Sequence, residues 1–179
     1  MVREVEIRSL LSEQKYGELC ELLPKKFTKV NEDVLTTVRF RPNDVRVRYS
    51  DKIREIVFKD GNPTSVSRNE LSINLKDRGD CEKTIALLKQ LGFKNDPPWV
   101  KRKQEFVCEY GGFEYTLSLQ HVENFAYLLE AEIMLEDEDD ALHVENLKKI
   151  LESLGCKPIE PNEFNARIAA YVENNSWIK

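Results

Sequence analysis

Apolar and polar residues alternate at every second position over several segments, a pattern typical of strands with one apolar and one polar face. The first is Val2–Arg8, where Glu4, Glu6 and Arg8 share the polar face. The same alternation returns in 45–49, 67–75, 100–107 and 128–135. The polar face of a single strand usually meets solvent. Five strands that share a dense face of mixed charge indicate a charged interior cavity instead.

These patterns and the turn signals between them predict eight strands and four helices. The strands are expected at 2–8, 34–40, 44–50, 53–59, 66–76, 100–110, 113–122 and 126–136, and the helices at 9–23, 80–92, 139–154 and 163–174. Strands in hairpins, interrupted by helices, predict an α+β fold, namely an eight-stranded antiparallel β-barrel with helices packed outside. A barrel of this size has a lumen just wide enough for side chains or one small ligand.

Several element ends have local signals. Ser9 or Ser12 is expected to cap the first helix and Pro24 to end it, while Asp80 is expected to cap the second helix. Gly111-Gly112 predicts a tight hairpin. No linker interrupts the series, so residues 1–179 are expected to form a single domain.

Composition narrows the function classes. The chain has 179 residues, of which 33% are charged and 41% hydrophobic, with a net charge of −5; a general nucleic-acid binder would carry a basic face. Much of the acidity lies in 136–145, which is expected to be a solvated loop that opens a helix. Apolar stretches are too short for a membrane span and the N-terminus has no signal-peptide core, which predicts a cytoplasmic protein without a membrane partner. The four cysteines have no C-x-x-C spacing, which argues against a zinc ribbon.

The basic members of the polar faces would crowd one lumen. They are Arg8, Arg46, Arg48, Lys59, Arg68, Lys101 and Lys103. Two like charges ~6 Å apart repel by roughly 2–3 kcal/mol at an effective dielectric constant near 20. Neighbouring acids offset part of this cost, and the remainder favours a polyanionic ligand, because arginine binds phosphate oxygens bidentately and lysine supplies a point charge. The sequence has no G-x-x-x-x-G-K-[ST] motif, so phosphate would be bound by side chains on strands.

Two pairs of acids have the i, i+2 spacing that directs two carboxylates to one side of a strand. The pairs are Glu4 with Glu6 and Glu130 with Glu132. Carboxylates together with phosphate oxygens are the usual ligands of Mg²⁺ or Mn²⁺. The pattern therefore predicts a divalent cation beside the polyanion.

In order and spacing, these motifs resemble the CYTH domain of the triphosphate tunnel metalloenzymes. That family includes class IV adenylate cyclases, thiamine triphosphatases and inorganic triphosphatases. Glu4-x-Glu6-x-Arg8 resembles the family signature E-x-E-x-K, and the resemblance spans nearly the whole chain. Its other parts are Arg46-x-Arg48, Lys59, Arg68-x-Glu70, Lys101-x-Lys103 and Glu130-x-Glu132.

The resemblance implies an eight-stranded antiparallel tunnel that binds a triphosphate end-on with a divalent metal. The implied phosphate-binding residues are Arg8, Arg46, Arg48, Lys59, Arg68, Lys101 and Lys103. The implied ligands of Mg²⁺ or Mn²⁺ are Glu4, Glu6, Glu130 and Glu132, and Glu70 is a candidate for positioning metal or water.

The chain departs from the family pattern at three positions. Arg8 replaces the signature lysine, and Lys103 stands where arginine is common. Gln120, ten residues before Glu130, stands where the family usually has aspartate, and glutamine cannot serve as a carboxylate ligand or base. Glu70 and Gln120 are the catalytic candidates, and the departures are expected to limit turnover more than binding.

The leading hypothesis is a metal-dependent phosphohydrolase whose substrate contains a triphosphate: inorganic triphosphate, thiamine triphosphate or a nucleoside triphosphate. One alternative is a class IV-type adenylate cyclase that converts ATP to cyclic AMP, and another is a non-catalytic module that binds polyphosphate or nucleotide. A third is a β-protein whose charges form only ion-pair networks. A homodimer is an open alternative to the monomer.

Overall fold

The computed structural model describes residues 2–61, 65–136 and 140–174. In chain order its elements are β1 (Val2–Leu11), α1 (Glu13–Lys26), β2 (Thr28–Arg41), β3 (Asp44–Tyr49), β4 (Arg54–Lys59), β5 (Ser67–Asn74), α2 (Arg78–Gln90), β6 (Lys94–Asn95), β7 (Trp99–Tyr110), β8 (Phe113–Val122), β9 (Ala126–Leu135), α3 (Asp140–Ser153) and α4 (Pro161–Asn174). Among these elements, no helix has both the length and the apolar character that a membrane crossing requires. Of the acidic run expected to open a helix, 137–139 lie outside the described residues, and α3 begins directly after them.

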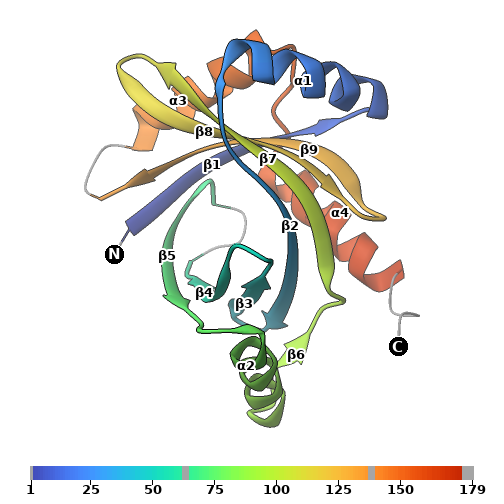
Figure 1. Cartoon of the computed structure of the whole chain (residues 1–179). Coiled ribbons are helices and arrows are strands. Elements are labelled where there is room, and N and C mark those ends of the chain that lie inside the picture. Colours follow the sequence, from blue (N-terminus) through green and yellow to red (C-terminus); the bar gives the residue numbers. More distant parts are fainter. Residues whose placement is uncertain (1, 62–64, 137–139, 175–179) are drawn as a thin grey trace.

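Eight of the strands close into an antiparallel barrel with the helices outside it (Figure 1). The order around the ring is β3-β4-β5-β1-β9-β8-β7-β2, and β2 pairs with β3 to complete it. The short strand β6 pairs with the end of β2. The predicted α+β barrel with external helices is confirmed.

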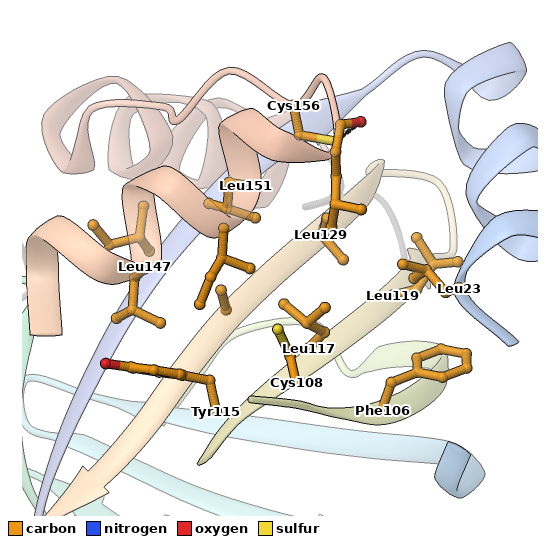
Figure 2. Close-up of a cluster of buried hydrophobic side chains, with 14 of the residues drawn as sticks. Leu23, Phe106, Cys108, Tyr115, Leu117, Leu119, Leu129, Leu147, Leu151 and Cys156 are labelled. Atoms are coloured by element: carbon orange, nitrogen blue, oxygen red, sulfur yellow. Dashed lines mark hydrogen bonds between the residues drawn. The ribbon is translucent and has the colours of Figure 1, made fainter. Parts of the chain in front are cut away.

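The main hydrophobic cluster lies between the barrel wall and two helices, α1 and α3, and smaller clusters lie against α2 and α4. Outward side chains such as Leu117, Leu119 and Leu129 pack there with Leu23 of α1 and Leu151 of α3 (Figure 2). Full burial of one such leucine stabilises the fold by about 1.5–3 kcal/mol. Because the apolar member of each alternating pair is used on the outside, the charged member faces the lumen.

The first helix extends beyond its predicted end. Ser12 is its cap, with its hydroxyl accepting a hydrogen bond from the Lys15 amide at 3.1 Å. The expectation that Pro24 ends the helix is wrong, since α1 continues to Lys26. Pro24 lies in the last turn, where a missing N–H removes one bond close to the end of the helix, and Phe27 N–H still bonds to the Leu23 carbonyl.

Other boundaries also differ from the prediction. Residues 9–11, expected in the first helix, extend β1 to Leu11, so α1 begins only at Glu13 and Ser9 is not its cap. Asp77, not Asp80, caps α2, and its carboxylate accepts a hydrogen bond from the Asp80 amide at 3.0 Å. Strand β2 begins at Thr28, six residues earlier than predicted, because its exposed first residues pair with β7 without showing apolar alternation. The Gly111-Gly112 hairpin is confirmed: both residues have positive φ, +60° and +83°, as a two-residue turn between strands requires.

Candidate functional site

Strand register directs the charged side chains of β1 and β9 into the same lumen. Glu6 lies opposite Glu132, and Arg8 lies opposite Glu130. Residues directly opposite each other in an antiparallel pair point to the same face of the sheet. The i, i+2 acid pairs of the sequence therefore meet side by side inside the barrel.

A polar cavity of about 230 Å³ occupies this lumen. The structure brings together all the sequence-predicted site residues except Arg68 in its lining. They are Glu4, Glu6, Arg8, Arg46, Arg48, Lys59, Glu70, Lys101, Lys103, Gln120, Glu130 and Glu132. The cavity is thus a single chamber with both basic and acidic walls.

Arg68 lies apart from this lining and is 7% exposed. Its guanidinium donates to Asp44 at 2.7 Å and to the backbone carbonyls of Lys59 and Asp60 at 2.7 and 2.9 Å. These bonds tie the end of β4 to β5. The structure therefore separates Arg68 from the other predicted phosphate-binding residues.

Three carboxylates gather at one end of the chamber. Glu4, Glu6 and Glu132 each offer an oxygen, and these oxygens lie within 4.8 Å of one another. Burial raises the pKa of Glu132 to about 8, with Glu4, Glu130 and Glu6 adding to the effect. Burial also raises the pKa of Glu4, followed by the charge of Glu6. Crowded carboxylates with unfavourable charge fit a hard divalent cation, which takes oxygen ligands.

Lys59 approaches the same cluster from β4. Its ammonium forms ion pairs with Glu4, with Glu70 at 3.2 Å and with Glu6 at 3.9 Å. Burial alone would lower the pKa of Lys59, but these acids raise it, Glu6 most strongly. Lys59 is therefore a buried cation that partly neutralises the carboxylates.

Arg8 is placed between two acids one step further along the barrel. It forms ion pairs with Glu6 and with Glu130, the latter at 2.7 Å from Nε. Burial works to raise the pKa of Glu6, but Arg8, Lys59 and Arg46 hold it at about 2. Burial likewise opposes ionisation of Glu130, but Arg8 and Lys101 lower its pKa. Glu130 is thus engaged by Arg8 and lies outside the three-carboxylate cluster.

Gln120 is the residue that departs most from the family pattern, and it has a defined role here. Its amide nitrogen donates to Ser118 Oγ at 3.0 Å and to the Glu130 carboxylate. The side chain is buried, and its Oε1 has no partner among the described residues. Gln120 therefore supplies a donor to Glu130, which an aspartate could not do in its ionised form.

The other wall of the chamber is basic. Arg48 pairs with Glu55 at 3.0 Å and Glu70 at 3.1 Å, and Lys103 pairs with Glu105 at 2.6 Å. Burial lowers the pKa of Lys101, and nearby Arg46 works in the same direction against the charge of Glu130. Positive charge is concentrated here, as the sequence predicted, in a place that favours an anion.

Sequence reasoning missed Asp44, which organises this wall. Asp44 is 7% exposed and pairs with Arg39 at 2.8 Å, Arg46 at 2.8 Å and Arg68 at 2.7 Å. It lies one residue before the alternating segment 45–49, inside the predicted strand 44–50, and was therefore not counted with the polar face of Arg46 and Arg48. Its i, i+2 spacing from Arg46 is the signal that could have found it.

A second cavity, of about 90 Å³, adjoins the first and shares five of its lining residues. The shared residues are Arg8, Arg46, Arg48, Lys101 and Glu130. Its remaining walls are largely apolar, with Trp99 from β7, Leu128 from β9 and Phe164 from α4. This chamber could not be predicted from the sequence, because its residues come from distant elements and have the composition of ordinary core.

No protein-family model matches the chain, and no curated protein does. Solved structures do share its fold. A Pyrococcus horikoshii protein, PH1819, is 23% identical with a TM-score of 0.70. The match covers 88% of this chain and 93% of the PH1819 chain. An adenylate cyclase candidate from Vibrio parahaemolyticus is 16% identical with a TM-score of 0.62. The match covers 86% of this chain and 89% of the Vibrio chain.

A third neighbour is HpAC1 from Hippeastrum, an adenylyl cyclase candidate with a dominant triphosphatase activity. It is 12% identical with a TM-score of 0.57, covering 89% of this chain and 90% of its own. At these identities the likeness concerns the fold. The resemblance to the CYTH domain is confirmed at that level by the barrel and by these neighbours.

Proposed function

We propose that the chain is a divalent-cation-dependent phosphohydrolase that binds the triphosphate group of its substrate inside the barrel. One observation carries the proposal: a cluster of three carboxylates and a basic wall line the same chamber inside the barrel. A cation site next to an anion site is the arrangement that phosphoryl transfer requires.

The basic wall would hold the phosphates. Arg46 and Arg48 can each present two donors to phosphate oxygens, while Lys101 and Lys103 add point charges. Partial burial of these side chains strengthens the interactions because it reduces screening by water. A triphosphate would also offset the repulsion among these cations, which acids such as Glu70 and Glu105 only partly balance.

Glu4, Glu6 and Glu132 would hold Mg²⁺ or Mn²⁺. A bound cation of this kind polarises a phosphoryl oxygen and makes a coordinated water more acidic. Glu132, which retains its proton at neutral pH in the chamber as it stands, would lose that proton on binding a cation. Lys59 would then be left to pair with Glu70 and with phosphate oxygens.

Hydrolysis is favoured over cyclisation by the Hippeastrum neighbour, in which triphosphatase activity dominates. Cyclisation of ATP is the alternative that the Vibrio parahaemolyticus neighbour suggests. A non-catalytic binding module is the other alternative, and the engagement of Glu130 by Arg8 and Gln120 favours it, because that carboxylate is not free to act as a base.

The test is a phosphate-release assay with tripolyphosphate, thiamine triphosphate and ATP in the presence of Mg²⁺ or Mn²⁺, with cyclic AMP measured in parallel. We expect cation-dependent release of phosphate that is lost in Glu132→Gln, because the amide keeps the shape but not the charge that a hard cation requires. The matched control is Glu114→Gln, an exposed glutamate on β8. Release of phosphate that is equal with and without the cation would contradict the proposal, and cyclic AMP as the main product would favour the cyclase.

A further inference from the structure

The interior of the barrel changes character along its axis. On three strands the inward side chains change in the same direction along the axis: from acid to base on β1, from acid to apolar on β9, and from acid through base to apolar on β7. They are Glu4, Glu6 and Arg8 on β1; Glu132, Glu130 and Leu128 on β9; and Glu105, Lys103, Lys101 and Trp99 on β7. A ligand that fits this lumen has charge at one end and apolar character at the other.

The apolar end of the lumen is a cavity bordered by packed aromatic side chains. Phe164 of α4 packs against Val122 and Leu128, and Trp99 lies 5.1 Å from the Phe125 ring and 5.3 Å from the Tyr171 ring, between centroids. The cavity of about 90 Å³ that Trp99 and Phe164 border has room for several water molecules, since one water needs roughly 10–15 Å³. Aromatic walls of this kind favour a flat ring.

A buried hydroxyl also faces this chamber. Thr37 lines the cavity and is 8% exposed, and its Oγ1 has no hydrogen-bond partner in the part of the chain that the structure describes. Thr37 lies opposite Trp99 in the β2–β7 pair. A buried polar atom without a partner is costly. A ring that carries a hydrogen-bonding atom would satisfy it.

The two chambers are joined by basic residues. Arg8, Arg46 and Lys101 line both, and the Arg8 guanidinium lies 4.9 Å from the centre of the Phe164 ring. A phosphate chain held by these cations would point its outer end toward the carboxylates and its other end toward Trp99. Inorganic triphosphate would leave the apolar chamber unused.

We propose that the substrate is an organic triphosphate with a nitrogen heterocycle, and that the ring binds in the chamber of Trp99, Phe164 and Thr37. This inference rests on the proposed function, because it assigns the far end of the same ligand. Trp99 supplies the stacking face, and Thr37 supplies the hydrogen bond that selects a heteroatom.

The test is calorimetric titration of the full chain in EDTA, which prevents turnover, with ATP, thiamine triphosphate and tripolyphosphate as separate probes. At least one of the two organic probes should bind about tenfold or more tightly than tripolyphosphate, the effect expected of one stacked ring. Trp99→Ala should remove about tenfold of that probe's affinity, and Thr37→Val about threefold to tenfold. Both variants should leave tripolyphosphate affinity within about twofold.

Each variant has a matched control on its own strand. Tyr110→Ala removes an aromatic ring from the opposite end of β7, and Thr28→Val removes an exposed hydroxyl from the start of β2. Thr37→Val keeps the shape of the side chain, so it also serves if Trp99→Ala fails to fold. Tripolyphosphate binding as tight as both organic probes, or equal losses for all three probes in the variants, would overturn this inference and leave the proposed function standing. Absence of binding by all three probes, both in EDTA and in a second titration with Mg²⁺, would overturn both.

Discussion

The carboxylate of Asp44 accepts two hydrogen bonds from the guanidinium of Arg46, at 2.9 Å from Nε and 2.8 Å from Nη2. The same carboxylate also accepts from Arg39 at 2.8 Å and from Arg68 at 2.7 Å. Burial opposes its charge, but these arginines, Arg46 first, hold the pKa of Asp44 far below its ordinary value. Asp44 thus fixes Arg46 in the lumen and ties the basic wall to the β4–β5 region.

Asp44→Asn should be among the most damaging single substitutions in the lumen. It removes the charge shared by three arginines, and breaking a buried ion pair at one partner costs about 3–5 kcal/mol. Urea denaturation at neutral pH measures this loss. Asp51→Asn is the control, because Asp51 is exposed in the neighbouring β3–β4 turn, and it should change stability by less than about 0.5 kcal/mol. Equal stability of both variants would show that Asp44 does not organise the wall.

Tripolyphosphate should stabilise the protein against heat, and Arg48→Ala should remove much of that effect. A ligand that binds only the folded state adds about 2.7 kcal/mol at a hundredfold excess over Kd. Arg48 lines both chambers, whereas Arg102 on the same barrel is exposed and pairs only weakly with Glu123, at 3.5 Å. Arg102→Ala should therefore retain the shift in melting temperature. An equal shift in melting temperature in both variants, or no shift in the wild type, would contradict a phosphate site at Arg48.

The fold was predictable because one physical rule, alternation at every second position, acts in nearly every strand. That rule fails where a strand is exposed on both faces, which is why the start of β2 at Thr28 was missed. It also says nothing about helix ends, where local bonds decide. Pro24 is tolerated near the end of α1, and Asp77 rather than Asp80 caps α2.

The sequence predicted which residues line the candidate site better than it predicted which of them contact one another. Alternation along each strand predicted that Arg46, Lys101 and Glu132 face one lumen. Only the strand register shows that Glu130 lies opposite Arg8 and does not join the other carboxylates. The apolar chamber could not be predicted. Phe164 lies on a helix whose contact with the barrel mouth depends on the path of the chain, and its sequence pattern is that of ordinary core.

The metal-free protein should become less stable as pH rises from about 4.5 to about 8, as far as Glu132 is concerned. Its folded pKa of about 8 lies above the ordinary value of 4.5, so the folded state binds a proton in this window that the unfolded state has released. At about 1.4 kcal/mol per pKa unit, discounted for partial exposure, the loss is on the order of 2–4 kcal/mol.

Glu132→Gln tests this loss because it replaces the protonated acid with a neutral group of the same shape. Urea denaturation in EDTA should show the variant more stable than the wild type at pH 9 and nearly equal at pH 5. Glu114→Gln, exposed on β8, should match the wild type at both values. A Glu132→Gln protein that gains nothing at pH 9 would mean that Glu132 ionises normally and that the cluster is not crowded.

For Gln120, the family pattern and this structure lead to opposite expectations. The sequence suggests that a missing aspartate limits turnover, so that Gln120→Asp would raise kcat with Mg²⁺ or Mn²⁺. In the structure the Gln120 amide donates to Glu130, and an ionised aspartate there would face a carboxylate. Two like charges about 4 Å apart repel by about 4 kcal/mol at an effective dielectric constant of 20.

We therefore expect Gln120→Asp to lower stability at pH 8 and to recover it near pH 5, where the two carboxylates share a proton. At neutral pH its kcat should be no higher than that of the wild type. Gln120→Asn separates charge from length, because it shortens the side chain but keeps the amide, and its stability should not depend on pH in this way. Kinetics and urea denaturation from pH 5 to 9 decide between the two accounts. A several-fold rise in kcat at pH 7 with unchanged stability would show that the chain lacks a carboxylate that its chemistry can use, and that the bond from Gln120 to Glu130 is dispensable.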